Sequence, residues 1–368
     1  MSRADAVAAV RQGVGLFPMD SRGLIEVRGG DRERWLDGMI SGDVSALSKG
    51  PEGAGCYATL LTNRGAIVAD LHVGKLRDSF WIESAAGQIA NIKEALERFI
   101  IADDVELVDR SAEFSAWGIE GPCASVLLER FLGEGADSAL PGADQWCETS
   151  FERLGVSAMI AGFGFSGESA FQVRVPASSG EALGEALAGT ARDAVEAGLL
   201  PGFGLGDDAA LEVLRVEAGI PDLESELLGV LPPEARLEDA IATDKGCYVG
   251  QEIVARLRSR GQVNHLLVGL RLSESASLPE AGVELKAGDR KTGRVTSAVV
   301  SPTEGAIALG FVRREHAEAG ARVVLGSGDG HEAVVAELPL VAGLARTVSE
   351  QSEKSDDGPD VSSGQKPA

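Results

Sequence analysis

Residues 244–252, Asp-Lys-Gly-Cys-Tyr-Val-Gly-Gln-Glu, have the residue types and spacing for thiol chemistry. Cys247 lies between two glycines and close to Lys245. Glycine allows positive φ and close approach of a partner, and residues 252–256 are typical of a first helical turn, whose free N–H groups favour an anion. A nearby ammonium group and a helix N-terminus both favour a thiolate. The segment therefore predicts a reactive thiolate at Cys247; the alternative is a small cysteine packed in a tight turn.

The same segment resembles the signature of the YgfZ family of folate-binding proteins, which are relatives of the T-protein of the glycine cleavage system. Residues 245–252, continued by Val254 and Arg256, carry this resemblance. Five other stretches are similar to runs of these two groups: Trp35-Leu36, Ser41–Val44, Leu61–Gly65, Gly164–Glu168 and Leu214–Pro221. The similarity spans about residues 25 to 340.

The resemblance implies a pocket for tetrahydrofolate. Phe165 and Gln172 occupy the places of a pocket aromatic residue and of the pterin-reading acid of the T-protein. Phenylalanine keeps the stacking face but loses a hydroxyl group, and glutamine keeps a hydrogen-bonding edge but loses the charge. The other expected folate contacts are Tyr57, Asp70, Arg215 and Tyr248. Arg215 could bind a ligand carboxylate bidentately, or it could form a structural ion pair with Glu217 or another acid.

One departure from the T-protein pattern concerns residues 65–71, Gly-Ala-Ile-Val-Ala-Asp-Leu, where T-proteins have two successive acids. Here the first acid is replaced by Ala69 and only Asp70 remains. We expect this loss to remove a group that handles protons on the one-carbon unit. The sequence therefore disfavours aminomethyl transfer.

Composition excludes several classes of protein. The 368-residue chain carries a formal net charge of −23, which opposes binding to duplex nucleic acid. It has no apolar run long enough to span a membrane and no secretory signal, so a cytoplasmic protein is expected. The four cysteines show no spacing typical of a zinc site or a dithiol centre. Residues 244–260 are locally basic, which favours either an anionic ligand or a solvated surface.

Hydrophobic periodicity predicts a mixed α+β fold. Alternation over 66–76, followed by Phe80-Trp81-Ile82, indicates a hairpin, and Ile89, Ile92, Leu96 and Phe99 repeat at helical spacing. Further strands are expected at 105–108 and 170–175, and further helices at 124–131, 180–187 and 209–215. The glycine-rich residues 202–206 are expected to form a turn.

Six short strands separated by Gly, Pro and Ser turns follow Gln262, which predicts a small β-barrel or sandwich. The resemblance to the T-protein group, in which a C-terminal barrel closes over the folate domain, implies the barrel. We therefore expect a T-protein-like, multi-domain folate-binding fold with three parts. These are residues 1–260 as two interleaved α+β subdomains, residues 261–342 as the barrel, and residues 343–368 as a disordered tail.

The resemblance implies a folate-binding accessory protein for iron-sulfur cluster assembly or repair, with an indirect effect on tRNA modification. Its partners would be a folate and iron-sulfur client or assembly proteins. Cys247 would contact iron or sulfide, or exchange with a client thiol; Lys245 would favour its thiolate and Arg256 would orient an anionic group. The alternatives are a folate-dependent aminomethyl or methyl transferase and a non-catalytic interaction scaffold.

Overall fold

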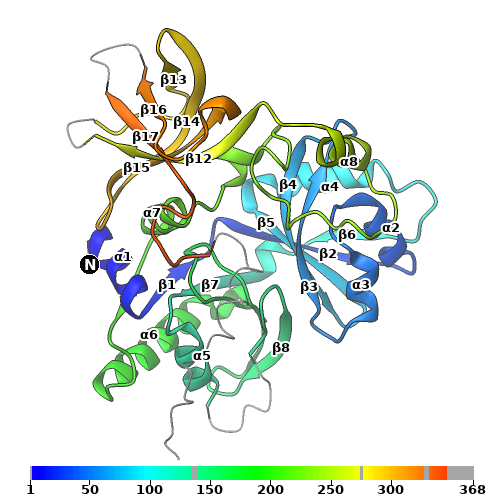
Figure 1. Cartoon of the computed structure of the whole chain (residues 1–368). Coiled ribbons are helices and arrows are strands. Elements are labelled where there is room, and N and C mark those ends of the chain that lie inside the picture. Colours follow the sequence, from blue (N-terminus) through cyan, green and yellow to red (C-terminus); the bar gives the residue numbers. More distant parts are fainter. Residues whose placement is uncertain (1, 134–139, 274–276, 327–330, 346–368) are drawn as a thin grey trace, which may run out of the picture.

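The computed structural model describes residues 2–133, 140–273, 277–326 and 331–345. Two open sheets and one closed barrel form its framework. Figure 1 shows the barrel at the top, the five-stranded sheet at the right, and the six-stranded sheet below, with helix α7 between them. The fold is the mixed helix-and-sheet architecture that the sequence predicts.

The five-stranded sheet contains the predicted hairpin. Its strands, in spatial order, are β3 (Gly55–Leu61), β4 (Ile67–Leu76), β5 (Ser79–Ala85), β2 (Arg22–Arg28) and β6 (Glu106–Asp109). Three helices accompany it: α2 (Arg32–Met39), α3 (Val44–Lys49) and α4 (Ile89–Glu97). Helix α4 buries Ile89, Ile92 and Leu96, as predicted, but it ends before Phe99, whose side chain is 44% exposed.

The six-stranded sheet packs against three helices. Its strands, in spatial order, are β11 (Phe203–Leu205), β1 (Val14–Pro18), β7 (Phe114–Glu120), β10 (Ala170–Pro176), β9 (Val156–Ala161) and β8 (Trp146–Phe151). Its helices are α1 (Arg3–Gln12), α5 (Ala124–Leu132) and α6 (Gly180–Glu196). The turn expected at 202–206 is wrong, because Phe203–Leu205 pairs in parallel with Val14–Leu16.

The predicted barrel is present and closed. Its strands are β12 (His265–Leu272), β13 (Glu284–Ala287), β14 (Arg290–Ser301), β15 (Gly305–Arg313), β16 (Arg322–Leu325) and β17 (Glu332–Ala336). One side of each strand fills the barrel interior, while Leu267, Leu309 and Phe311 belong to the core shared with the five-stranded sheet. The barrel is therefore anchored to the rest of the molecule by apolar contacts.

Helix α7 (Asp208–Ala218) connects these parts. It begins at Asp207, whose side chain accepts from the Ala210 N–H group, and it ends at Gly219, which has φ 71°. A short π-helical turn, η4 (Leu223–Leu227), follows, and helix α8 (Gln251–Arg260) precedes the barrel.

The expected division at residue 260 stays a prediction. The disordered tail was expected to begin at residue 343, but Leu344 and Ala345 are buried. The Ala345 N–H group donates to the Gly167 carbonyl oxygen, which holds this part of the chain against the body. Residues 346–368 lie outside the described residues. Within the described ranges, no helix is both long and apolar enough to cross a bilayer.

Candidate ligand site between the sheets

A cavity of about 220 Å³ lies where the two sheets meet α7 and η4. Its lining combines two aliphatic walls with an aromatic ring and several charged groups. The lining residues are Met19, Ser21, Arg22, Asp70, Phe165, Asp208, Leu211, Glu212, Arg215, Pro221, Asp222 and Leu223. Three of the predicted folate contacts, Asp70, Phe165 and Arg215, are thus brought together.

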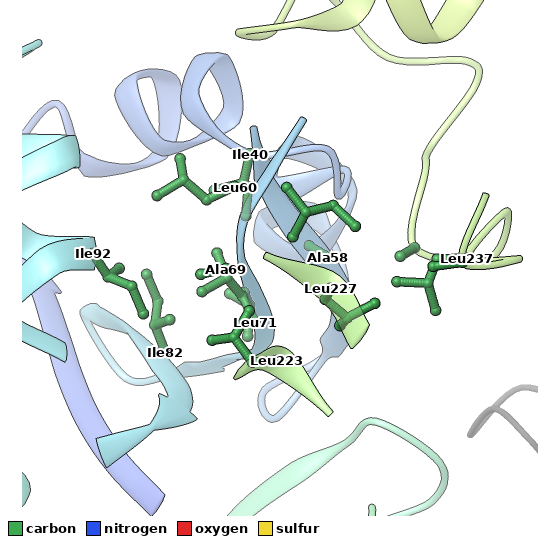
Figure 2. Packing of buried hydrophobic residues seen from close by; sticks show 14 of the residues in the cluster. Ile40, Ala58, Leu60, Ala69, Leu71, Ile82, Ile92, Leu223, Leu227 and Leu237 are labelled. Atoms are coloured by element: carbon green, nitrogen blue, oxygen red, sulfur yellow. The ribbon is translucent and has the colours of Figure 1, made fainter. Parts of the chain in front are cut away.

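Strand β4 delivers Asp70 to this cavity. Successive side chains of a strand point to opposite faces, so Ala69 and Leu71 enter the hydrophobic cluster, which Figure 2 shows together with Ile82, Leu223 and Leu227. Asp70, on the opposite face, is 5% exposed and accepts a 3.3 Å hydrogen bond from the Tyr57 hydroxyl group at Oδ2. Burial, and then the Asp70 charge, raise the Tyr57 pKa well above its usual value.

This alternation corrects the expectation drawn from Ala69. An acid at position 69 would point into hydrocarbon, whereas Asp70 lines the cavity. Among the described residues, Asp70 Oδ1 has no hydrogen-bond partner. The replacement at position 69 therefore leaves the cavity with its carboxylate acceptor, and it no longer argues against one-carbon chemistry.

A buried ion-pair chain supports the wall beside Asp70. Glu83, on β5 and fully buried, pairs with Arg22 on one side and with Arg174 on the other. Burial alone would raise the pKa of Glu83, but the two guanidinium groups outweigh it and the pKa is lowered. Burial would likewise lower the pKa of Arg22, yet Glu83 and Asp70 raise it. Arg22 is thus held as a cation.

Arg22 also faces the cavity. Its guanidinium carbon lies 4.8 Å from the centre of the Phe165 ring. Within the described residues, its terminal nitrogen NH2 is buried without a hydrogen-bond partner. Arg22 therefore offers the N–H groups of one terminal nitrogen next to an aromatic face, a combination suited to a planar polar ring.

Glu120 fixes the turn that carries Phe165. Its carboxyl group accepts from the Phe165 N–H at 3.1 Å and from the Ser166 N–H and hydroxyl groups at 3.1 and 2.7 Å. Burial raises the pKa of Glu120 to about 7, against the opposing effect of these hydrogen bonds. Glu120 is fully buried and had no signal in the sequence beyond its place on a strand.

Gln172 lies behind the cavity and is not part of its lining. It is 0% exposed, and both its amide atoms lack hydrogen-bond partners in the described part of the chain. Its Nε2 atom and the Met19 sulfur lie 3.5 and 3.0 Å from the point that a Cβ on Gly118 would occupy. Gln172 is therefore a neighbour of Met19, which does line the cavity.

Arg215 does not present a free guanidinium group. Its nitrogens donate to both oxygens of Glu212, to Glu226 at 3.1 Å and to the Ser297 hydroxyl group at 2.7 Å. This is the structural alternative left open by the sequence, with Glu212 and Glu226 as partners. Glu217 instead binds Arg11. A bidentate contact of Arg215 with a ligand carboxylate would require these bonds to break.

The thiol segment forms a separate surface feature. Cys247 is exposed, four residues before the first residue of α8. Gly250 has φ 83° and caps this helix, whereas Gly246 has no positive φ and a Cβ there would contact nothing within 4 Å. None of residues 245–256 lines the cavity.

Lys245 is turned away from solvent. Its ammonium group donates to the carbonyl oxygens of Asp37, Ile40 and Gly42 at 2.6, 3.0 and 2.5 Å, and its side chain is 1% exposed. Burial lowers the pKa of Lys245, and the ion pair with Asp37 opposes this shift. The Lys245 ammonium group therefore does not pair with Cys247 as expected. It fixes the segment 37–42 instead.

The two remaining predicted residues also have local partners. Tyr248 is 7% exposed and belongs to the hydrophobic core, with the Lys245 ammonium nitrogen 5.4 Å from its ring centre. Tyr248 does not line the inter-sheet cavity, and its folate contact stays a prediction. Arg256 lies on the exposed face of α8 and pairs with Glu252 at 2.8 Å.

Sequence reasoning missed the charged groups around the cavity. Arg22, Glu83 and Arg174 lie on strands, and Arg174 stands between two valines. A charge at the inward position of an alternating strand is the signal that could have found Glu83 and Arg174.

Comparisons with known proteins place this geometry in a family context. Residues 2–245 match the GCVT N-terminal domain, and residues 266–341 match the glycine cleavage T-protein C-terminal barrel domain. An aminomethyltransferase of Rubrobacter xylanophilus is 33% identical over 310 residues, which cover 83% of this chain and 78% of that protein. An aminomethyltransferase of Corynebacterium jeikeium is 31% identical over 338 residues, with 87% and 84% covered.

A solved structure has the same fold. The crystal structure of the glycine cleavage system aminomethyltransferase T from Bartonella henselae matches with a TM-score of 0.79. The sequences are 22% identical, and the match covers 94% of this chain and 91% of that one.

Proposed function

Because the chain belongs to the glycine cleavage T-protein family, we propose that its inter-sheet cavity binds tetrahydrofolate and that it transfers a one-carbon unit between an amine and this folate. The relatives that match along most of the chain are named aminomethyltransferases. The observation that carries the proposal is Asp70, a buried carboxylate on the cavity wall with Oδ1 unpartnered among the described residues.

The lining residues fit a pterin ring. Phe165 offers an aromatic face, Arg22 an unpartnered N–H donor and Asp70 an unpartnered acceptor. A volume of about 220 Å³ suits the ring rather than the whole molecule, because sites for larger ligands occupy roughly 300 Å³ or more. We therefore expect the glutamate tail to leave through the mouth of the cavity.

Each group would then have one task. When bound, tetrahydrofolate supplies the nitrogen atoms that accept or release the one-carbon unit. Asp70 holds or takes a proton at Oδ1, within a site where Tyr57 donates to Oδ2. Arg22, fixed by Glu83, orients the polar edge of the ring over Phe165. Glu120 keeps the Phe165 turn in place.

Three carboxylates in the lining support an amine as the second substrate. They belong to Asp208, Asp222 and Glu212, of which Glu212 pairs with Arg215. Carboxylates attract an ammonium group and repel anions. An aminomethyl donor that carries an ammonium group is therefore a better match for this lining than an acidic co-substrate.

Turnover tests this function. Incubation with tetrahydrofolate and an aminomethyl donor, whose transferred carbon already has the oxidation state of formaldehyde, should yield methylene-tetrahydrofolate and release the amine. Asp70→Asn should reduce the rate by roughly 100-fold or more. Cys247→Ala, a matched change on the separate surface, should leave the rate unchanged. An Asp70→Asn variant that folds and keeps full turnover would refute the proposal.

The thiol segment favours a second candidate. Cys247 is exposed in the Lys-Gly-Cys-Tyr-Val-Gly-Gln-Glu run that resembles the YgfZ signature. An accessible thiol can contact iron or sulfide, or exchange with a client thiol. In this hypothesis the protein assists iron-sulfur enzymes and thereby tRNA modification, with the folate as an accessory.

Complementation separates the two candidates. Under oxidative stress, a Cys247→Ala chain should fail to restore iron-sulfur enzyme activity if the thiol acts there. Full rescue by that variant would remove the thiol hypothesis and leave the transferase. Absence of heat on titration with tetrahydrofolate would remove both and leave a non-catalytic scaffold.

A further inference from the structure

A second cavity, of about 300 Å³, lies between the outer face of the barrel and the segment 230–234. Its lining shares no residue with the inter-sheet cavity. Strands β14 and β15 form most of one wall. The lining residues are Val230, Glu234, His265, Lys291, Thr292, Gly293, Arg294, Phe311 and Arg313. We call this cavity the barrel crevice.

The barrel crevice is basic although the chain as a whole carries −23. Three cationic side chains line it, Lys291, Arg294 and Arg313, against the single carboxylate of Glu234. Lys291 pairs with Glu284 at 2.6 Å. In the described ranges, Arg294 and Arg313 form no ion pair. Two guanidinium charges are thus available to a ligand.

One of these guanidinium groups is held in position by an aromatic ring. The Arg294 guanidinium carbon lies 5.3 Å from the centre of the Phe311 ring. Phe311 is 4% exposed and belongs to the core between barrel and body, so the ring is a fixed support. Stacking leaves the N–H edge of arginine free to bind an oxyanion.

Thr292 gives the crevice a polar floor. It is 1% exposed, and its hydroxyl oxygen has no hydrogen-bond partner among the described residues. Thr292 and Arg294 both line the crevice. A buried hydroxyl group without a partner is unfavourable, so an acceptor that enters the crevice is favoured.

The neighbouring glycine explains why the strands lie so close here. A Cβ on Gly293 would lie 2.0 Å from the Phe311 carbonyl oxygen. Glu234, across the crevice, accepts a hydrogen bond from the Leu231 N–H at 3.3 Å with its own carboxylate. The Glu234 carboxylate is therefore partly engaged by a backbone N–H group of its own turn.

We propose that the barrel crevice binds a small oxyanion, whose phosphate or carboxylate group accepts hydrogen bonds from Thr292, Arg294 and Arg313. The site is independent of the folate proposal, because no residue is common to the two cavities. Two guanidinium groups and a hydroxyl donor are the usual components of such sites. The ligand connects the barrel to the segment 230–234, whose Val230 carbonyl accepts from Ile67 on β4 at 2.8 Å.

Calorimetry on the full chain tests this proposal with two probes, inorganic phosphate and glutarate. We expect saturable binding of at least one of them, and its identity separates a phosphate ligand from a carboxylate ligand. Arg294→Gln and, separately, Thr292→Val should each weaken binding about tenfold or more, since a hydrogen bond to a charged group contributes roughly 1.5–3 kcal/mol.

The matched control is Arg322→Gln, which removes a cation from the same barrel outside the crevice, where Arg322 pairs with Glu332. It should leave binding unchanged. Thr292→Val keeps the shape of the side chain, so it remains informative if Arg294→Gln folds poorly. No saturable binding of either probe, or equal binding by the Thr292→Val variant, would overturn the proposal.

Discussion

Two thiols of this chain lie in opposite environments, and their reactivities should differ accordingly. Cys247 is exposed, whereas burial raises the pKa of Cys56 to about 12, with a smaller opposing effect of Lys245. Because only the thiolate is alkylated at a useful rate, iodoacetamide at pH 8 should modify Cys247 at least about 100-fold faster than Cys56. Peptide mapping by mass spectrometry gives both rates in one sample.

Unfolded protein is the control for that experiment, because both thiols should then react alike. If Cys56 in the folded chain were labelled as fast as Cys247, the burial of the Cys56 sulfur beside Gly42 would be wrong.

Glu120 should make stability depend on pH. Its pKa is about 7 in the folded chain and 4.5 in its ordinary state, so the folded state holds this proton more tightly. The contribution is fully present below pH 4.5 and is lost as pH rises through 7, by roughly 3 kcal/mol at most. Urea unfolding at pH 5 and pH 8 gives the loss in the free energy of unfolding between these two pH values. This loss should be smaller in Glu120→Gln than in the wild type by about this amount.

Glu129→Gln, on the exposed face of α5, serves as the control and should keep the wild-type dependence on pH. An identical pH dependence in wild type and Glu120→Gln would show that Glu120 ionises normally in the folded chain.

At the level of elements, two glycines of the thiol segment should respond differently to substitution. Gly250 has φ 83°, and a Cβ there would lie 2.5 Å from the Thr62 carbonyl oxygen; at Gly246 a Cβ would meet nothing. Gly250→Ala should lower the free energy of unfolding by about 2–4 kcal/mol, through backbone strain and the clash. Gly246→Ala should change it by no more than about 0.5 kcal/mol.

Urea unfolding of the two variants decides this prediction, since each is the other's control. Equal losses would mean that the segment is held by something other than the approach of Gly250 to the loop at residues 62–65.

Periodicity predicted those elements whose burial is local. The hairpin β4–β5 and all six barrel strands follow from alternation, because each places one face on a core. The strand at 203–205 could not be read, since its partner Val14–Leu16 lies almost 190 residues away in the sequence. The expectation drawn from Ala69 failed for a related reason. The face of β4 that meets the cavity depends on the register of the strand, and a shift by one residue exchanges the two faces.

Side-chain partners were the least predictable part of the site. Lys245 is part of the thiol motif, yet its ammonium group donates to carbonyl oxygens of residues about 200 positions earlier in the sequence. Arg215 likewise reaches Ser297 on the barrel. Asp70 and Phe165 were predicted through resemblance, whereas Arg22 and Glu83 depend on how the two sheets approach each other, which no local pattern reports.

At the scale of the whole molecule, Glu217 on α7 joins three parts. Its Oε2 accepts from Arg11 of α1 at 2.8 Å, its Oε1 accepts from the Ser301 hydroxyl of the barrel at 2.6 Å, and its carbonyl accepts from the Leu340 N–H at 2.8 Å. Such a junction couples the barrel to the sheet that forms one wall of the inter-sheet cavity.

This junction makes a prediction about energetic coupling. Glu217 is 1% exposed and Arg11 14% exposed, so removing one partner leaves the other charge buried. Glu217→Gln and Arg11→Met should each lower the free energy of unfolding by about 3–5 kcal/mol. The double variant should lose at least about 1 kcal/mol less than the two single losses together, because the second substitution removes a charge that the first had left without its partner.

The exposed pair Arg322–Glu332 on the barrel provides the matched cycle, with coupling below about 1 kcal/mol. Urea unfolding of the wild type and the six variants gives both coupling energies. A buried pair that couples no more strongly than the exposed one would mean that α1 and α7 are held together by their apolar contacts alone. In that case the polar links through Ser301 and Leu340 would be too weak to transmit a change at the barrel to the cavity wall.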